Sequence, residues 1–137
     1  GDNIFFNMLY SQIKKAFINL KKEYSTIFGY KVKNPEEFGV AKLNKKSQII
    51  DILEKPKKKI SNIAVVGLYF FTNNVIKYSK ILKPSKRNEL EITDLIKLYL
   101  NEKKLKIEIL KKKTKWFDAG TFDSILKISN FVKNKKI

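Results

Sequence analysis

Apolar residues along the chain follow two spacings, one typical of helices and one typical of strands. Apolar side chains three or four residues apart predict helices over 9–23, 73–82, 91–103 and 121–132, the last with Thr121 as its N-cap. Shorter alternating or β-branched runs predict strands, and Pro56 ends one of them. These strands fall at 25–32, in a short stretch through Val40, within 46–56, at 63–71 and, as an edge strand, within 104–112.

Strands and helices mixed in this order predict an α/β fold with a mixed sheet. The chain has 137 residues, enough for a single domain over 1–137 with its own core. It shows no internal repeat and no linker long or polar enough to divide it. The longest apolar run, 63–71, has the length of a strand and is far shorter than a membrane span.

The residue inventory excludes several kinds of chemistry. The chain has no cysteine and no histidine, which rules out thiolate nucleophiles, Cys/His zinc sites and Ser-His catalysis within it. Carboxylates, lysines, hydroxyls, backbone groups and Arg87 remain. Of the common metals, these groups suit a hard, oxygen-preferring cation such as Mg²⁺.

The net charge of +17 raises the question of nucleic-acid binding. Of 30 basic residues only Arg87 is arginine, and lysines recur along the whole chain together with abundant Ile and Asn. Because these residues have AT-rich codons, we attribute much of the charge to genome bias. The dense runs at 55–59 and 111–115 are interpreted as solvated loops or strand ends, which argues against a nucleic-acid partner. A basic binding module is the alternative, and steeply salt-dependent DNA retention would favour it.

Two aspartates are candidate metal ligands, Asp2 in "GDN" and Asp118 in "WFDAGT". Mg²⁺ is commonly held by one or two carboxylates together with substrate phosphates. The two residues can share a metal only if the fold brings their chain segments together. Otherwise Asp2 is a turn residue, and Asp118 begins a helix-capping turn.

Further candidates follow strands or lie in loops. Glu54 can accept hydrogen bonds from sugar hydroxyls and Lys55 can pair with phosphate, although the two can equally form a surface pair that closes a strand. The only arginine, Arg87, can bind phosphate through two parallel hydrogen bonds. Alternatively, its presence reflects codon usage alone. Gly39 and Gly67 mark either a close approach of backbone or ligand, or a bulge.

Six blocks taken in order carry a resemblance to a known family. They are "GDNIFF", "FGV", "EKP", "SNxAVxGLYFF", "LKPSxRxELEITD" and "WFDAGTFDSILxxSNFV". From Gly1 to about Val132 the chain resembles the bacterial glucose-1-phosphate thymidylyltransferases, which make dTDP-glucose for deoxysugars such as rhamnose.

The resemblance implies a fold and a place within it. It implies the mixed-sheet portion of the nucleotide-diphospho-sugar transferase fold, a Rossmann-like α/β architecture, without its N-terminal nucleotide-binding half. In that family the Gly-Asp-Asn block lies mid-chain, downstream of a G-x-G-T-R-L loop and a lysine that handle the nucleoside triphosphate. We therefore expect these 137 residues to be the sugar-binding half, and to be inactive alone.

The resemblance also assigns roles to residues. Asp2 and Asp118 would bind Mg²⁺, and Lys55 and Arg87 would hold the sugar phosphate and orient it for reaction. Three positions depart from the family pattern: Asn7 and Asn88 stand where Gly is usual, and Ala119 stands where Thr is usual. The glucose pocket would be lined by Gly39, Glu54, Val65 and Tyr69.

The function implied is transfer of a thymidylyl group from dTTP to glucose 1-phosphate, with release of pyrophosphate. The implied setting is a cytoplasmic homotetramer, for which the apolar faces of the last two helices are candidate contacts. Two alternatives stay open: a sister enzyme that uses UTP or another sugar phosphate, and a non-catalytic remnant. Binding of glucose 1-phosphate that Arg87→Ala abolishes would favour the enzyme.

Overall fold

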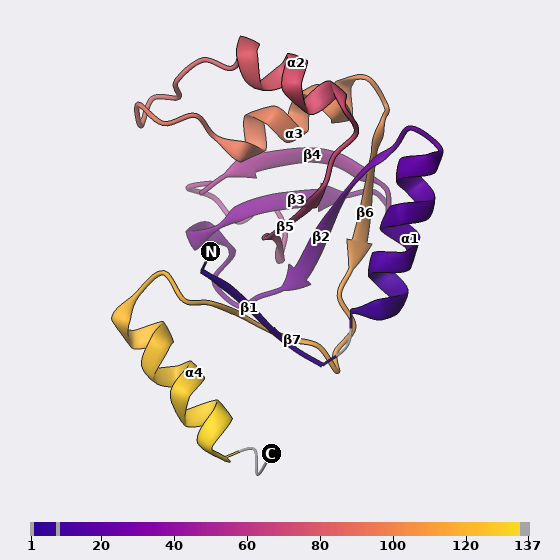
Figure 1. Ribbon diagram of the computed structural model, residues 1–137. Helices are drawn as coiled ribbons and strands as arrows, with labels where there is room; N and C mark the ends of the chain where they lie inside the picture. The colour runs from indigo at the N-terminus through magenta and orange to yellow at the C-terminus, as the bar shows by residue number, and fades with distance from the viewer. Residues whose placement is uncertain (1, 8, 135–137) are drawn as a thin grey trace.

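A five-stranded sheet, a two-stranded ribbon and four α-helices make up residues 2–7 and 9–134, the part of the chain that this computed structural model describes (Figure 1). Gly1, the first residue of the Gly-Asp-Asn block, lies outside the described residues. In chain order the elements are β1 (Asn3–Phe6), α1 (Tyr10–Lys21), β2 (Ser25–Lys31), the 3₁₀ turn η1 (Pro35–Glu37), β3 (Gly39–Leu43), β4 (Ile49–Glu54), β5 (Ile63–Phe70), α2 (Asn74–Ile81), α3 (Ile92–Asn101), β6 (Leu105–Ile109), β7 (Lys115–Asp118) and α4 (Phe122–Asn134).

The main sheet is mixed, as the sequence predicts. Its strand order is β4-β3-β5-β2-β6, in which only the β2–β6 pair is parallel. The predicted edge strand within 104–112 is β6, and it does lie at an edge. The predicted strand through Val40 is too short, since β3 continues to Leu43 in antiparallel pairing with β4.

Both faces of this sheet are buried at its central strands, β2 and β5. In β2 Ile27 faces a core formed with α3, whereas the next residue, Phe28, faces a second core formed with α1, and neither side chain is exposed. In β5 Val65 belongs to the first core and Val66 to the second. A strand covered on both sides needs apolar residues at successive positions, which explains the unbroken apolar run at 63–71.

The two-stranded ribbon of β1 and β7 is absent from our sequence-based prediction. It pairs Asn3 with Asp118 and Phe6 with Lys115 in antiparallel register. Each strand has only four residues, and its sole partner lies more than a hundred residues away along the chain. The pairing therefore depends on the tertiary fold, and local periodicity does not report it.

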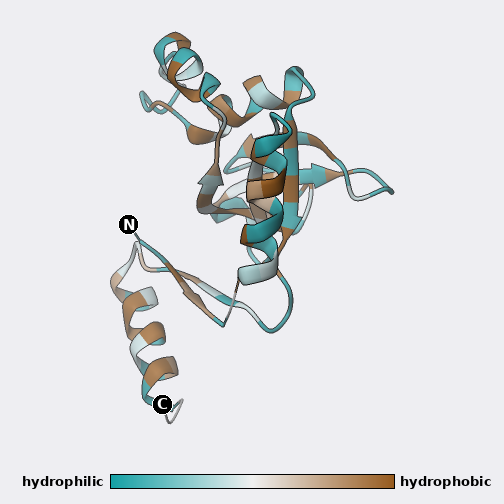
Figure 2. Ribbon diagram, turned by 45° about the vertical axis from the view of Figure 1, so that its right-hand side comes forward, coloured by the Kyte–Doolittle hydropathy of each residue, from teal (hydrophilic) through white to brown (hydrophobic). Residues whose placement is uncertain are grey.

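The last two helices differ in what their apolar faces contact. In α3, Leu95, Ile96 and Tyr99 are buried in the core, so this face is not available to a partner. The helix α4 stands apart from the main sheet, and its apolar positions show as brown segments in Figure 2. Phe122 is 83% exposed. The Ser124 N–H donates to the Thr121 hydroxyl (3.2 Å), as expected of the predicted N-cap.

The side chain of Asn3 links the ribbon to the main sheet by hydrogen bonds, beside the packing of Trp116 on Tyr30. Its Oδ1 accepts hydrogen bonds from the Gly67 N–H in β5 (2.9 Å) and from the Trp116 Nε1–H in β7 (2.6 Å). The carboxamide lies so close to β5 that a Cβ added to Gly67 would come within 2.3 Å of Asn3 Nδ2. The sequence left a bulge or a close approach open for Gly67, and the structure shows both, because the β2–β5 register also shifts between Val65 and Tyr69.

No helix in the described part of the chain has both the length and the apolar character needed to cross a membrane.

We expect Gly67→Ala to destabilise the protein by about 1–3 kcal/mol, because the added methyl group displaces the Asn3 carboxamide. The cost should fall sharply in an Asn3→Ala background, where the colliding side chain is absent. Urea unfolding of the two single variants, the double variant and the wild type measures this coupling. Strictly additive costs would contradict the assignment of Gly67 to this contact.

Candidate functional site

A cleft of about 210 Å³ opens where β3, β4 and β5 meet the start of α3 and the ribbon. We call it the sugar cleft. It brings together five of the residues that the resemblance assigned to sugar and phosphate, from three separate stretches of sequence. Its lining includes Gly39, Glu54, Lys55, Val65, Tyr69, Thr93, Trp116 and Asp118.

Strand pairing places Gly39 and Glu54 directly opposite each other at one end of the cleft. A Cβ on Gly39 would lie 2.8 Å from Thr93 Cγ2 and 3.2 Å from Glu54 Oε2. Gly39 therefore allows β3 to approach these two side chains, which settles its role in favour of a close approach. A larger residue here would push Thr93 or Glu54 away from the cleft.

Tyr69 supplies a hydrogen-bond donor to the same cleft. Burial, and then the negative charges of Glu54 and Asp2, raise the pKa of its phenol from 10.0 to about 12. The hydroxyl therefore keeps its proton throughout the physiological range. Its ring stacks on Phe71, with centroids 5.6 Å apart, so the side chain is held by the core below the cleft.

Thr93 is a cleft residue that the sequence reasoning missed. It is 1% exposed, and its Oγ1 has no hydrogen-bond partner among the described residues. A buried hydroxyl without a partner carries a desolvation cost. The block "EITD" in the sequence contains this residue, but nothing in its spacing marks the hydroxyl.

A second hollow, of about 790 Å³, adjoins the sugar cleft and is called here the aspartate groove. Lys55, Trp116 and Asp118 line both spaces. Asp2 and Asp123 line the groove alone. A ligand with a sugar in the cleft could therefore extend past Lys55 toward both predicted metal ligands.

The ribbon brings Asp2 and Asp118 together. The Ala119 N–H donates to the Asp2 carbonyl (2.6 Å), which continues the β1–β7 pairing to the end of the ribbon. A Cβ on Gly120 would lie 3.1 Å from Asp118 Oδ1 and 3.7 Å from Asp2 Oδ2, so the two carboxylates border one small space beside Gly120. Two carboxylates facing an open space, with room for phosphate oxygens, fit Mg²⁺.

No cluster of three or more acidic side chains that could hold a metal by itself exists within residues 2–7 and 9–134. Any ion at Asp2 and Asp118 would therefore draw its other ligands from water or substrate.

Two hydrogen bonds fix the directions of these carboxylates. Asn3 Nδ2 donates to Asp2 Oδ1 (2.9 Å), and the Gly120 N–H donates to Asp118 Oδ1 (3.0 Å). Asn3 thus contacts Asp2, Gly67 and Trp116 with one carboxamide. The sequence analysis quoted Asn3 within "GDN" but gave it no role.

The cleft and groove are acidic although the chain is strongly basic. Their lining includes five carboxylates and two lysines, against a net charge of +17 for the whole protein. Lys55 makes no ion pair within the described chain, and its amine is available to a ligand. The carboxylates are those of Asp2, Glu37, Glu54, Asp118 and Asp123, and the lysines are Lys55 and Lys127.

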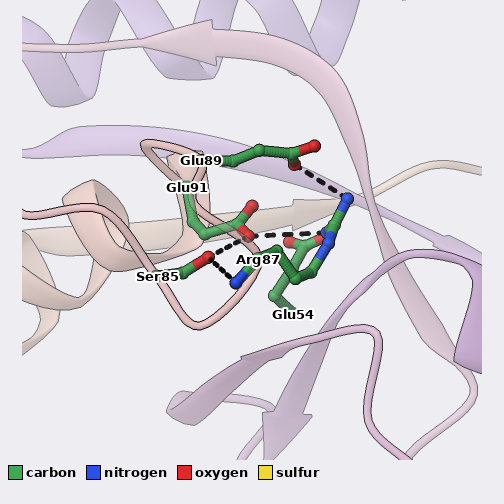
Figure 3. A network of polar contacts seen from close by, with 5 residues as sticks. All are labelled: Glu54, Ser85, Arg87, Glu89 and Glu91. Atoms are coloured by element: carbon green, nitrogen blue, oxygen red, sulfur yellow. Dashed lines mark hydrogen bonds and ion pairs between the residues drawn. The ribbon is translucent and has the colours of Figure 1, made fainter.

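Arg87 lies beside the sugar cleft rather than in its lining, in a network of carboxylates (Figure 3). Its Nη2 is 2.8 Å from Glu89 Oε2, while its Nη1 is 3.5 Å from Glu91 Oε1 and 3.8 Å from Glu54 Oε1. Of the residues that the resemblance assigned to the sugar and its phosphate, Arg87 is thus the one that lies outside the lining of the cleft. Glu54 links Arg87 to the cleft, because it pairs with Arg87 and also lines the cleft.

The loop that carries Arg87 is held by Ser85. The Ser85 hydroxyl donates to Glu91 Oε1 (2.8 Å) and accepts from the Arg87 N–H (3.1 Å). Asn88 has φ = 59° and Asn7 has φ = 71°. Both stand where the family usually has Gly, and Asn is the residue that best tolerates this left-handed region after Gly. These two departures therefore preserve the backbone that Gly would allow.

Comparison with known proteins assigns the chain to a family. The nucleotidyl transferase family model matches residues 1–135. The chain belongs to the nucleotidyl transferase family. It is 42% identical over 132 residues to the glucose-1-phosphate thymidylyltransferase of Neisseria meningitidis, and 43% identical over 133 residues to that of Xanthomonas campestris. These matches cover 96% of this chain and 46% and 44% of those proteins, so the chain spans about half the length of the curated relatives it matches.

Solved structures of nucleotidyl transferases share the fold. A structure assigned to a Bacillus anthracis glucose-1-phosphate thymidylyltransferase, in complex with sucrose, superposes with a TM-score of 0.84 at 37% identity, over 99% of this chain and 53% of that one. A UDP-glucose pyrophosphorylase complexed with UDP-glucose superposes with a TM-score of 0.82 at 24% identity, over 98% of this chain and 54% of that one. The resemblance to the thymidylyltransferases and the predicted mixed-sheet α/β fold are both confirmed.

The raised pKa of Tyr69 predicts a pH dependence of stability. Between about pH 10 and 12 the unfolded chain releases this phenol proton while the folded protein retains it, so the free energy of unfolding should fall as pH rises. Tyr69→Phe should make that fall shallower, by up to about 1.4 kcal/mol per pH unit. Urea unfolding at a series of alkaline pH values measures it, and an unchanged slope would contradict the raised pKa.

Proposed function

We propose that this chain supplies the sugar-phosphate site of a glucose-1-phosphate thymidylyltransferase that forms dTDP-glucose and pyrophosphate from dTTP and glucose 1-phosphate. The observation that carries the proposal is the convergence of Gly39, Glu54, Lys55, Val65 and Tyr69 on one cleft beside Asp2 and Asp118. Curated relatives with this activity in their names are 32–43% identical to the chain. The two solved UDP-glucose pyrophosphorylases have a lower sequence identity to the chain, 24% and 26%.

The sugar would be recognised by complementary hydrogen-bonding groups. Glu54 accepts hydrogen bonds from sugar hydroxyls, whereas the neutral phenol of Tyr69 donates one. The methyl groups of Val65 give the apolar face of the ring a surface to pack on.

The phosphate of the sugar would lie toward Lys55, at the boundary between the sugar cleft and the aspartate groove. Lys55 gives it a compact positive charge, and the guanidinium of Arg87 adds a second from beside the cleft. Together these cations hold one phosphate oxygen in line with the α-phosphorus of dTTP. Orientation of this kind contributes much of the rate in phosphoryl and nucleotidyl transfer.

The reaction needs no general base. A phosphate monoester has a second pKa of about 6, so the attacking oxygen of glucose 1-phosphate is already an anion at neutral pH. It forms a bond to the α-phosphorus of dTTP, and the bond from that phosphorus to the pyrophosphate oxygen breaks. Mg²⁺ held by Asp2 and Asp118 would neutralise charge on the reacting phosphates. The absence of His and Cys from the chain agrees with this chemistry.

The remaining expectations from the resemblance belong to this proposal. They are a product that serves deoxysugar synthesis such as that of rhamnose, and a homotetramer. Of the two apolar helix faces considered for such contacts, only that of α4 is exposed, through Phe122, Ile125 and Leu126. The 137 residues alone are still expected to release no pyrophosphate from dTTP.

Binding of glucose 1-phosphate by this chain tests the proposed site. Trp116 is the only tryptophan in the sequence and lines the sugar cleft, so its fluorescence should change saturably on titration. We expect Lys55→Ala or Arg87→Ala to weaken binding by about 1.5–3 kcal/mol, since each removes a charged hydrogen-bond donor. Lys57→Ala, an exposed lysine in the same basic run, is the matched control. No saturable signal by fluorescence or calorimetry would refute the site.

Mn²⁺, a paramagnetic substitute for Mg²⁺, tests the roles of the aspartates. In the presence of glucose 1-phosphate, Asp118→Asn should weaken Mn²⁺ binding roughly tenfold or more, as loss of a direct ligand costs at least as much as loss of its supporting contacts. Its affinity for the sugar phosphate without metal should not fall. Asp123→Asn, which lines the same groove from α4, is the control. Electron paramagnetic resonance reports free Mn²⁺, and equal effects of both substitutions would argue against the metal role.

A further inference from the structure

The guanidinium of Arg87 is enclosed by more negative charge than it can neutralise. Three carboxylates, those of Glu54, Glu89 and Glu91, lie within 3.8 Å of its nitrogen atoms. A phosphate that approaches this arginine meets the carboxylates as well. Phosphate and carboxylate also compete for the same pair of parallel N–H groups, so Arg87 cannot fully engage both.

The three carboxylates differ in how easily they can leave. Glu89 makes the shortest contact, 2.8 Å to Nη2, yet its side chain is 57% exposed. The side chain of Glu91 is 9% exposed and accepts a hydrogen bond from Ser85. Glu54, 21% exposed, is fixed at the end of β4. Only Glu89 can move into water without leaving a buried charge unpaired.

The contacts also divide by nitrogen atom. Nη2 is paired with Glu89, whereas Nη1 faces Glu91 and Glu54. Release of Glu89 therefore frees one whole edge of the guanidinium while Glu91 still holds the other. Figure 3 shows Glu89 and Glu54 on different sides of the arginine side chain.

We propose that Glu89 is an exchangeable partner of Arg87, displaced from the guanidinium when a phosphate monoester binds beside the sugar cleft. This inference rests on the proposed function, because it takes Arg87 as a ligand of the sugar phosphate. Glu89 sets the affinity for phosphate by competition, and Glu91 keeps the arginine at the cleft in both states. Glu89 thus acts through Arg87 as a positioning residue and does not touch the substrate.

The test uses the fact that Arg87 is the only arginine in the chain. Its Nε–H therefore gives one arginine side-chain signal in a ¹H–¹⁵N spectrum of the 137-residue protein. Inorganic phosphate and glucose 1-phosphate should each shift this signal. In Glu89→Gln the shift should saturate at a ligand concentration roughly two- to fivefold lower, the effect of removing one exposed ion pair.

Two controls separate competition from a general change in charge. Glu23→Gln removes one negative charge from an exposed position outside the cleft and should leave the affinity for phosphate unchanged. In an Arg87→Ala background, calorimetry should show that Glu89→Gln no longer tightens binding. A gain of affinity is informative because damage to the fold would weaken binding.

Each outcome decides the inference. Unchanged or weaker binding by Glu89→Gln, a gain matched by Glu23→Gln, or a gain that persists without Arg87 would overturn it. If glucose 1-phosphate changes Trp116 fluorescence while the Arg87 signal stays still, the exchange is wrong and the proposed function stands. If inorganic phosphate behaves as expected but glucose 1-phosphate does not bind, the exchange stands and the sugar is wrong. Failure of both ligands to bind overturns both.

Discussion

The arrangement of the candidate site depends on the carboxamide of Asn3. This side chain joins two sheets that otherwise have separate hydrogen-bond ladders, through the Gly67 N–H on one side and the Trp116 indole on the other. Both of these groups donate to Asn3, so the oxygen Oδ1 must face them. The amide nitrogen Nδ2 is then left to donate to Asp2. The position of the ribbon and the direction of a candidate metal ligand are therefore set by the same group. Because the carboxamide reaches β5 to make these contacts, Gly67 has no room for a Cβ.

Charge is distributed in this protein with opposite signs at the surface and at the site. Lysines occur along the whole chain, yet the cleft and groove are lined mostly by carboxylates. A phosphorylated sugar bound there would need its negative charge compensated locally, by Lys55, by Arg87 and by the metal proposed at Asp2 and Asp118. The carboxylates in turn favour sugar hydroxyls and a divalent cation over a second anion. Recognition of glucose 1-phosphate would thus depend on a few cations held among acids, and not on the net charge.

The elements with strong periodicity could be predicted from sequence, because burial imposes that periodicity. The run at 63–71 indicates a strand covered on both faces, and the apolar spacing of Leu95, Ile96 and Tyr99 indicates a helix packed on a core. The ribbon could not be predicted, since its strands are short and pair across the length of the chain. For the same reason the roles of Asn3 and Thr93, and the carboxylates around Arg87, were not apparent. Each depends on side chains brought together by the fold.

The backbone at Lys55 shows the same dependence on tertiary context. Its φ of 38° is unusual for a residue other than Gly or Asn, and such conformations cost of order 1–3 kcal/mol. They persist where the surroundings determine them. Here the Lys55 N–H donates to the Phe38 carbonyl (3.0 Å), directly after the last β3–β4 pair. The result is that the amine is carried to the boundary of the sugar cleft and the aspartate groove. A relaxed strand end would continue past Glu54 in the direction of β4, so this backbone conformation is what places Lys55 at that boundary.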